Sequence, residues 1–194
     1  MKVKVTSQGD SQDHVFDVST KGNEKTIIKT IAPTRDLGRD MLMVEQNMWA
    51  FIPNLKRAVR VSLSQKLTGE AANGDISRMR WAQDYDAKIE KEDAKAWTLF
   101  LTANKQGLTY EKVRARVEKK TFRPLDAEYL TKADKVLKNA KFESYKPIAG
   151  ETRPTVIAIQ DAVQTDKSTR IEIESITVKD LPDSLFSVER FSSR

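Results

Sequence analysis

Three short strand patterns follow one another between residues 33 and 62, and they constrain the fold more than any other part of the chain. Residues 41–45 are apolar on both faces of the expected strand. Residues 48–52 place Trp49 and Phe51 on one face, and residues 58–61 return after a turn at Pro53. A sheet with large apolar side chains on both faces must be covered on both sides or must line a cavity. The choice between these two arrangements bears directly on function.

The alternation of a half-buried strand recurs along the chain, most clearly where Val113, Ala115 and Val117 alternate with charged residues. Short turns separate the patterns, and no strand-helix-strand spacing occurs. We therefore expect a mainly β fold of about ten or eleven antiparallel strands in one large sheet or barrel. Helix signals are few: Asp75 would cap a short helix over residues 76–82, and Asp183 would open a final turn ending at Phe186.

Length and composition fit one domain spanning residues 1–194, because a chain of this size with 39% hydrophobic residues can bury a sizeable core. No apolar run approaches the roughly 20 residues that a membrane-spanning helix needs. The chain contains no cysteine, which excludes disulfides, thiolate metal sites and a cysteine nucleophile within it. Met1 opens directly onto a strand pattern, so we expect a truncated chain from which a signal sequence has been removed.

Residues suited to catalysis are sparse. His14 is the single histidine, at the junction of a turn and a strand, and a lone histidine is usually structural. Two pairs of acids are spaced two residues apart, but acids that alternate with other residues are typical of the solvent face of a strand; the pairs are Asp84 with Asp86 and Glu172 with Glu174. We expect no enzymatic activity, no metal and no cofactor.

The longest stretch without a strand pattern covers residues 63–83 and carries Gly69, Gly74, Met79 and Trp81. Loops longer than about 12 residues in compact domains are often lids or binding loops. An equally plain interpretation is that Met79 and Trp81 plug the edge of the sheet. The sequence leaves both interpretations open, and they are compatible.

A net charge of +6 and a pI near 9.4 suit either nucleic acid or an anionic membrane surface. Because the cations are interspersed with acids, an ordinary solvated surface is the simpler interpretation. Nucleic-acid binding is the main rival, since Trp49, Phe51 and Trp81 interleave with basic residues as in sheets that stack bases. Trp49 and Phe51 nevertheless lie among methionines, which favours an apolar wall. The cations concerned are Arg35, Arg39, Lys56, Arg57, Arg60, Arg78, Arg80, Arg114 and Arg116.

An ordered set of short motifs resembles the outer-membrane lipoprotein-sorting family, which belongs with the LolA-type carriers. The resemblance covers about residues 16–186 and no single motif is diagnostic. Its parts are Gly38-Arg39-Asp40-Met41-Leu42, Asn47-Met48-Trp49-Ala50-Phe51-Ile52-Pro53, Lys56-Arg57-Ala58-Val59-Arg60-Val61, Gly74-Asp75-Ile76-Ser77, Asp84-Tyr85, Tyr110-Glu111-Lys112-Val113, Arg123-Pro124-Leu125-Asp126-Ala127-Glu128-Tyr129, Phe142 with Tyr145, and Leu181-Pro182-Asp183 with Phe186.

The resemblance implies an exported periplasmic protein with an incomplete antiparallel β-barrel, a half-barrel whose concave face is covered by a few short helices. It also implies a helix before the first strand, which we expect to have been removed from this chain. It implies a carrier that holds acyl chains of a lipoprotein or another lipid and passes them towards the outer membrane. Its partners would be an inner-membrane transporter or an outer-membrane acceptor, with transient contact to a membrane surface and none to nucleic acid. The alternatives are a ligand-sensing or adaptor module that acts on a membrane transporter and, less favoured, a basic nucleic-acid-binding β domain.

Three groups of residues form the predicted site. The first group would line the apolar cavity, because its members alternate onto the same face of their strands and the methionines adapt to fill gaps. A one-residue error in register would exchange the faces. This group comprises Met41, Met43, Trp49, Phe51, Trp97, Leu99 and Leu101. Met79 and Trp81 would form a mobile lid or rim. Arg57, Arg60, Arg78 and Arg80 would form a docking surface for a membrane or a transporter.

Overall fold

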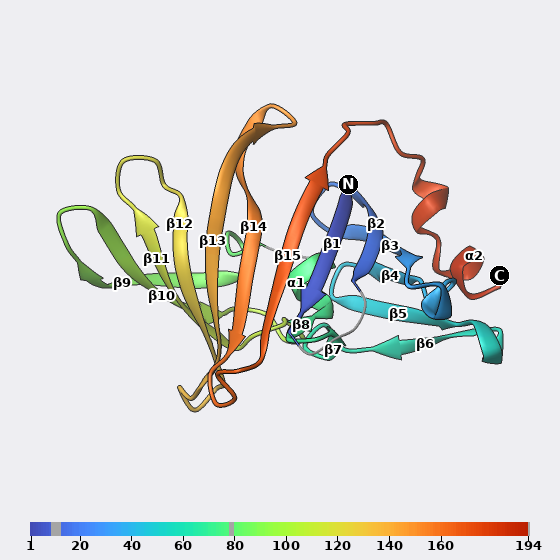
Figure 1. Ribbon diagram of the computed structural model, residues 1–194, viewed down its shortest axis with the longest axis horizontal. Coiled ribbons are helices and arrows are strands. Elements are labelled where there is room, and N and C mark those ends of the chain that lie inside the picture. The colour runs from blue at the N-terminus through green and yellow to red at the C-terminus, as the bar shows by residue number, and fades with distance from the viewer. Residues whose placement is uncertain (9–12, 78–79, 194) are drawn as a thin grey trace.

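One antiparallel sheet of thirteen strands dominates the computed structural model, which describes residues 1–8, 13–77 and 80–193 (Figure 1). The strands follow the order β6-β5-β4-β3-β2-β1-β15-β14-β13-β12-β11-β10-β9, so the sheet is open, with β6 and β9 as its edges. Its strands are β1 Lys2–Ser7, β2 His14–Lys21, β3 Lys25–Ala32, β4 Met41–Val44, β5 Asn47–Ile52, β6 Arg57–Val61, β9 Tyr85–Glu92, β10 Ala96–Ala103, β11 Lys112–Glu118, β12 Pro124–Leu130, β13 Val136–Ile148, β14 Glu151–Asp161 and β15 Ser168–Ser175.

The predicted mainly β, antiparallel architecture is confirmed, and the open sheet is consistent with an incomplete barrel. The described chain forms fifteen strands, more than the ten or eleven expected. Two of the additional strands, β7 Lys66–Thr68 and β8 Ala71–Ala72, lie in the stretch that we expected to be a loop, and they pair only with each other. Strands this short leave no alternation that a sequence pattern can reveal.

The three strands predicted between residues 41 and 61 are confirmed as β4, β5 and β6, and β4 and β5 are covered on both faces. Met41, Met43 and Met48 face one hydrophobic cluster. Leu42 and Phe51 face a second cluster on the opposite side of the sheet. The first of the two arrangements allowed by the sequence, coverage on both sides, is therefore the one observed.

The C-terminal segment provides the cover on the second face. It contains the 3-10 helix η3 Asp183–Phe186, at the place where a final turn was predicted, and the helix α2 Val188–Ser192. Phe191 is 1% exposed, and its ring meets the ring of Phe51 edge-on at 6.3 Å between centroids. This segment lies beside β3–β6 in Figure 1. It completes a small second core with Ile27, Leu42 and Phe186.

The larger cluster joins side chains from β1–β5 with side chains from β10–β15, so the sheet must curve around it. We call this side the inner face. Leu63, Ala71 and Ile76 belong to the same cluster, which places the segment 63–77 inside the curve. We call residues 63–77 the plug. It contains β7, β8 and the helix α1 Asn73–Ser77, all five residues of which are buried.

The second core generates a test of how far the C-terminal cover stabilises the fold. Phe191→Ala removes a fully buried ring, so we expect the free energy of unfolding to fall by about 3 kcal/mol, measured by urea denaturation. Phe122→Ala is the matched control, because Phe122 is 71% exposed; its effect should stay within about 0.5 kcal/mol. Equal effects of the two substitutions would contradict a stabilising role for the second core.

Candidate functional site

Hydrogen bonds hold the plug together and attach it to the inner face. The backbone N–H of Gly74 donates to the Leu63 carbonyl at 2.9 Å, and the Asn73 side chain donates to the Ser62 carbonyl at 2.8 Å. The hydroxyl of Thr26, on β3, donates to the Ser77 carbonyl at 2.9 Å. These contacts satisfy polar groups that would otherwise be buried without partners among apolar side chains.

A carboxylate lies at the centre of the plug. Asp75 accepts hydrogen bonds from the hydroxyl of Tyr110, at 2.9 Å to each oxygen, and from the backbone N–H of Ala72 at 2.8 Å. The ammonium of Lys138 lies 3.8 Å from Asp75 Oδ2 and donates to the carbonyl of Glu70. Asp75 was predicted to cap a helix over residues 76–82, whereas the helix forms at Asn73–Ser77 and contains it. The carboxylate therefore links the plug to β13 and to the turn before β11.

Burial shifts the pKa values of this group. Desolvation raises the pKa of Asp75 above its ordinary value of 3.8, although Lys138, Ala72 and Tyr110 oppose the shift. Desolvation also lowers the pKa of Lys138, against the attraction of Asp75 and Glu70. The pKa of Tyr110 is raised, mainly by burial and then by the nearby Asp75 carboxylate, so its hydroxyl stays protonated and donates.

Close backbone approach explains why two glycines occur in the plug. A Cβ atom at Gly74 would lie 1.7 Å from Thr109 Oγ1, which forbids any side chain there. Gly69 has a φ of +53°, and a Cβ atom would lie 1.9 Å from Ser7 Oγ. The two glycines let the plug lie against β1 and against the turn that precedes β11.

Strand register places three alanines in a row across the inner face. Ala115 on β11 pairs with Ala127 on β12, which pairs with Ala140 on β13. The next row along the same strands is bulkier and contains Val113, Tyr129 and Lys138. The alanine row (Ala115, Ala127, Ala140) is thus a strip of small side chains that crosses three strands, about 10 Å long at the usual strand spacing. Its members are 0%, 2% and 1% exposed, so neighbouring side chains cover it.

Several apolar side chains near the alanine row are only partly covered. Leu99 on β10 pairs with Ala115 at the end of the row and is half-buried. Trp81, also half-buried, meets Phe142 on β13 edge-on at 5.6 Å between ring centroids. Tyr145, further along β13, packs on the same cluster. The inner face beside the plug therefore offers apolar surface that is not fully buried.

The residues predicted to line one cavity divide among three places. Met41, Met43, Leu99 and Leu101 belong to the inner face. Trp49 and Phe51 belong to the second core on the opposite face, because Trp49 pairs with Leu42 and shares its side of the sheet. The prediction had grouped them with the two methionines, and that grouping was wrong by one residue of register.

Trp97 lies on the same side of β10 as Leu99 but near the end of the strand. Its ring stacks on Phe122 at 5.8 Å, with 27° between the ring planes. Alternation placed it on a face correctly, but alternation carries no information about how far along a strand the core extends. Trp97 is thus part of an exposed turn region and not of the covered core.

The residues predicted as a lid and as a docking surface are also separated. Met79 and Arg78 lie outside the described residues. The sequence 63–83 contains the buried plug, which is closer to the alternative interpretation than to an open loop. Arg57 and Arg60 lie on the edge strand β6, where Arg60 donates to the Asn47 side chain and its guanidinium lies 6.0 Å from the Trp49 ring.

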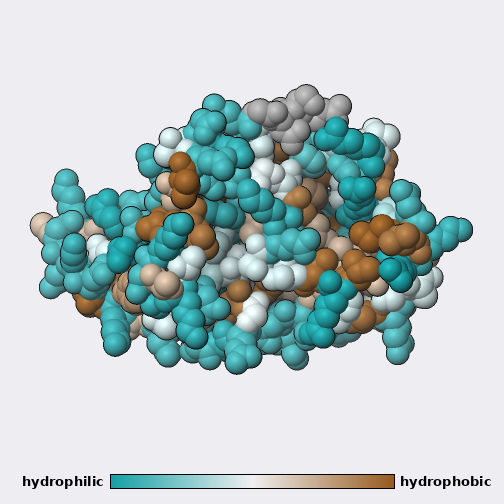
Figure 2. Space-filling view, turned by 90° about the horizontal axis from the view of Figure 1, so that it is seen from below, coloured by the Kyte–Doolittle hydropathy of each residue, from teal (hydrophilic) through white to brown (hydrophobic). Residues whose placement is uncertain are grey.

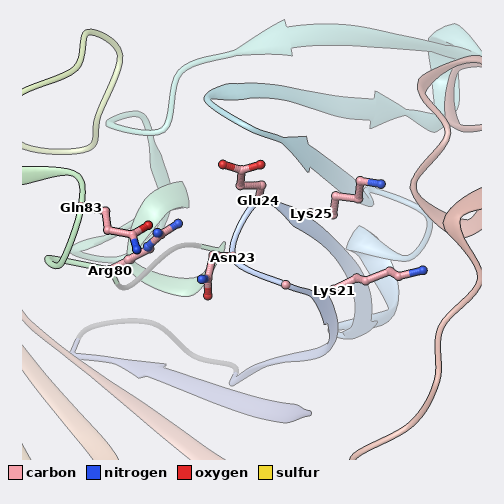
Figure 3. Close-up of a pocket in the computed structure, with 7 residues that line it drawn as sticks. Lys21, Asn23, Glu24, Lys25, Arg80 and Gln83 are labelled. Carbon is pink, nitrogen blue, oxygen red and sulfur yellow. The ribbon is translucent and has the colours of Figure 1, made fainter.

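Arg80 instead lines an open, polar pocket of about 510 Å³ beside the turn between β2 and β3 (Figure 3). Figure 3 shows Arg80 and Gln83 on one side of this pocket and Lys21 and Lys25 on the other. Both lysines bind Asp183, at 3.1 and 2.7 Å, and lower its pKa. The pocket thus joins the β2–β3 turn to the C-terminal segment, and it offers polar groups in place of an apolar lining.

One of the three aromatic residues that nucleic-acid binding would use is covered. Phe51 is 8% exposed and packed by Phe191, so it cannot stack on a base. Several of the candidate cations are held by acids, among them Arg114, which binds Glu90 and Glu128 at 2.7 and 2.6 Å. Figure 2 shows hydrophilic residues over most of one face of the molecule, with hydrophobic residues in separate patches.

In the described part of the chain, no three His, Cys, Asp or Glu residues come together as a metal site. His14 Nδ1 lies 3.0 Å from the hydroxyl of Thr68, and its Nε2 lies 3.6 Å from Asp36. It therefore connects β2 to the plug and to the 3-10 helix η1 Thr34–Asp36.

Within the described residues, no helix combines the length and the hydrophobicity that crossing a membrane requires.

The hydroxyl of Tyr110 provides a test of how the plug is held. Tyr110→Phe removes a donor to a buried carboxylate, so the free energy of unfolding should fall by about 1–3 kcal/mol, measured by chemical denaturation. Tyr129→Phe is the matched control: its ring stacks on that of Tyr110 at 4.0 Å, but the donors to Asp75 are the Tyr110 hydroxyl and the backbone N–H of Ala72. An equal loss in both variants would mean that ring packing, and not the bond to Asp75, matters.

The raised pKa of Asp75 predicts a pH dependence with a definite sign. Because the folded-state pKa lies above the unfolded value of 3.8, the contribution of Asp75 to stability is fully present below pH 3.8. It is lost as the pH rises through the folded-state pKa. Relative to Asp75→Asn, which cannot ionise, the wild-type protein should therefore become less stable as the pH rises from 3.8. Parallel stability curves for the two proteins would contradict the shift.

Comparison with known proteins agrees with the fold. A family model described as "uncharacterized protein" matches residues 22–193. No curated protein matches the sequence. The structure of a LolA superfamily protein from Nitrosomonas europaea is 30% identical, with a TM-score of 0.88, and the match covers 97% of this chain and 88% of that one.

Two more distant structures share the fold. One is a domain assigned to outer membrane lipoprotein sorting from Vibrio parahaemolyticus, with 20% identity, a TM-score of 0.78 and coverage of 98% and 89%. The other is a DUF1329 family protein from Desulfovibrio piger, with 19% identity, a TM-score of 0.78 and the same coverage. On the strength of its likeness to the Nitrosomonas protein, this chain belongs to the LolA superfamily.

Proposed function

We propose that this chain is a periplasmic carrier that holds acyl chains of a lipoprotein or another lipid on the inner face of its sheet and passes them towards the outer membrane. The observation that carries the proposal is the alanine row, a strip of small apolar side chains that lies next to a bulkier row and close to half-buried Trp81 and Leu99. Membership of the LolA superfamily and the likeness to a lipoprotein-sorting domain support it.

An apolar site is sufficient to hold an acyl chain. Burying one methylene gains about 0.8 kcal/mol, so a chain of about 16 carbons gains of order 10 kcal/mol before costs are subtracted. No catalytic group is needed, and the proposed role includes no chemical reaction. Because the alanine row is covered in this structure, a ligand must displace the side chains above it. Part of the gain is therefore spent on that rearrangement.

A larger side chain in the alanine row tests the proposal. Ala127→Leu adds bulk in the middle of the row, so the affinity for a fluorescent fatty acid should fall about tenfold, measured by titration with the tryptophan emission as a second readout. Ala158→Leu is the matched control. Ala158 lies on the neighbouring strand β14, where it pairs with Lys141 on β13 and Arg170 on β15 and does not belong to the inner cluster. The affinity of this variant should equal that of the wild type.

The result is interpreted only if both variants keep the wild-type circular dichroism spectrum. Equal affinities in the two variants would place the acyl chain elsewhere, and no saturable binding by the wild type would refute a carrier of acyl chains. Transfer separates a carrier from a sensor or adaptor. A carrier loaded with labelled lipid should deliver it to acceptor vesicles, whereas a sensor should retain it.

A further inference from the structure

The turn between β11 and β12 presents an aromatic ring to solvent among cations. Phe122 is 71% exposed, which is unusual for so large an apolar side chain. Lys119, Lys120 and Arg123 surround it in sequence, against the single acid Glu118 within residues 118–123. Glu92 pairs with Lys119 at 2.9 Å, whereas Lys120 has no ion pair among the described residues.

Two further aromatic rings lie close to this turn. The ring of Trp97 stacks on that of Phe122 at 5.8 Å, and the ammonium of Lys119 lies 5.6 Å from the centre of the Trp97 ring. The guanidinium of Arg123 lies 5.1 Å from the ring of Tyr145 on β13. We call Trp97, Phe122 and Tyr145, together with Lys119, Lys120 and Arg123, the aromatic tip.

Three neighbouring hairpins end in this region. The backbone N–H of Lys119 donates to the carbonyl of Lys95, which joins the β11–β12 turn to the β9–β10 turn at 2.8 Å. Figure 1 shows the turns β9–β10, β11–β12 and β13–β14 at the same end of their strands, at the upper left of the view. The aromatic tip is therefore a protruding edge and not a pocket.

Neither the backbone conformation nor the backbone hydrogen bond at position 122 requires an aromatic residue. Phe122 has a φ of +57°, a backbone conformation that suits Gly or Asn and disfavours bulky side chains. Its backbone N–H donates to the Glu118 carbonyl at 2.9 Å, a bond that any residue except proline makes. A residue that is unfavourable both for the backbone and for exposure points to a function at the surface.

We propose that the aromatic tip docks the protein on the surface of an anionic lipid bilayer. Aromatic side chains favour the interface between water and hydrocarbon, where their rings reach apolar chains. Lysine and arginine beside them attract anionic headgroups. The excess of cations over acids in the β11–β12 turn complements the negative charge of such a surface. Docking does not involve residues of the inner face.

The aromatic tip is continuous with the inner face along β10. Trp97, Leu99 and Leu101 share one side of this strand and pass from half-buried at the tip to 3% exposed at Leu101. This step rests on the proposed carrier function: the apolar side of β10 gives a lipid a path between a docked membrane and the alanine row.

Co-sedimentation with vesicles tests the docking surface. The wild type should bind vesicles of phosphatidylcholine mixed with phosphatidylglycerol, less so at high salt because screening weakens the attraction. Phe122→Asn suits the backbone but removes the ring, so binding should fall about tenfold. Lys120→Gln should reduce it about fivefold, the loss of one cation near the surface. Val163→Asn is the matched control, since Val163 is 72% exposed in the turn between β14 and β15; its binding should stay at the wild-type level.

Because the chain has no cysteine, single labels report which part enters the membrane. A nitroxide on Thr121→Cys should become shielded from a water-soluble relaxation agent when vesicles are added, and one on Thr165→Cys, in the β14–β15 turn, should not. Failure of the wild type to bind anionic vesicles, equal losses in Phe122→Asn and Val163→Asn, or shielding of the Thr165→Cys label alone would each overturn the proposal. Fatty-acid binding that persists in Phe122→Asn leaves the carrier function standing and separates the two proposals.

Discussion

A curved open sheet has an inner face that its own side chains do not fill, and the rest of the structure follows from how that space is occupied. The plug brings backbone as well as apolar side chains into it. Backbone in an apolar core must find hydrogen-bond partners. The Asp75 carboxylate, held by Tyr110 and Ala72 with Lys138 nearby, meets that need at the cost of burying charge. The polar contacts of the plug are thus a consequence of filling an open sheet with a short piece of chain.

The two halves of the sheet are stabilised differently, and this difference bears on where side chains can rearrange. The strands β3–β5 lie between the inner cluster and the C-terminal segment, so apolar cores hold them from both sides. The strands β9–β12 have an outer face of ion pairs, such as Arg116 with Asp126, and an inner face that includes half-buried Leu99. Solvated ion pairs contribute little to stability. Side chains of β9–β12 can therefore rearrange with a smaller loss of stability than side chains of β3–β5.

Alternation in the sequence was enough to predict the antiparallel strands and the final turn at Asp183, but it left open whether β4 and β5 are covered on both faces or line a cavity. It did not fix which residues of neighbouring strands share a face, because Leu42 pairs with Trp49 and Met43 with Met48 only through the register of a tight turn. The plug was hidden for another reason: a segment with strands of three and two residues has no period to detect. Its glycines were the available signal, since Gly69 and Gly74 sit where a Cβ atom would collide with Ser7 and Thr109.

The plug and a bound acyl chain would draw on the same inner face, and thermodynamic linkage then ties their free energies together. Any contact that stabilises the covered state lowers the apparent affinity for a ligand that must uncover the alanine row. By reciprocity, a bound chain weakens the closed arrangement to the same extent. Tyr110 and Tyr129 lie in or beside the bulky row that borders the alanines, and Tyr110 also holds Asp75. The polar contacts that let this sheet remain open without a ligand therefore also limit how tightly it can hold one, which is the compromise that a carrier requires for release.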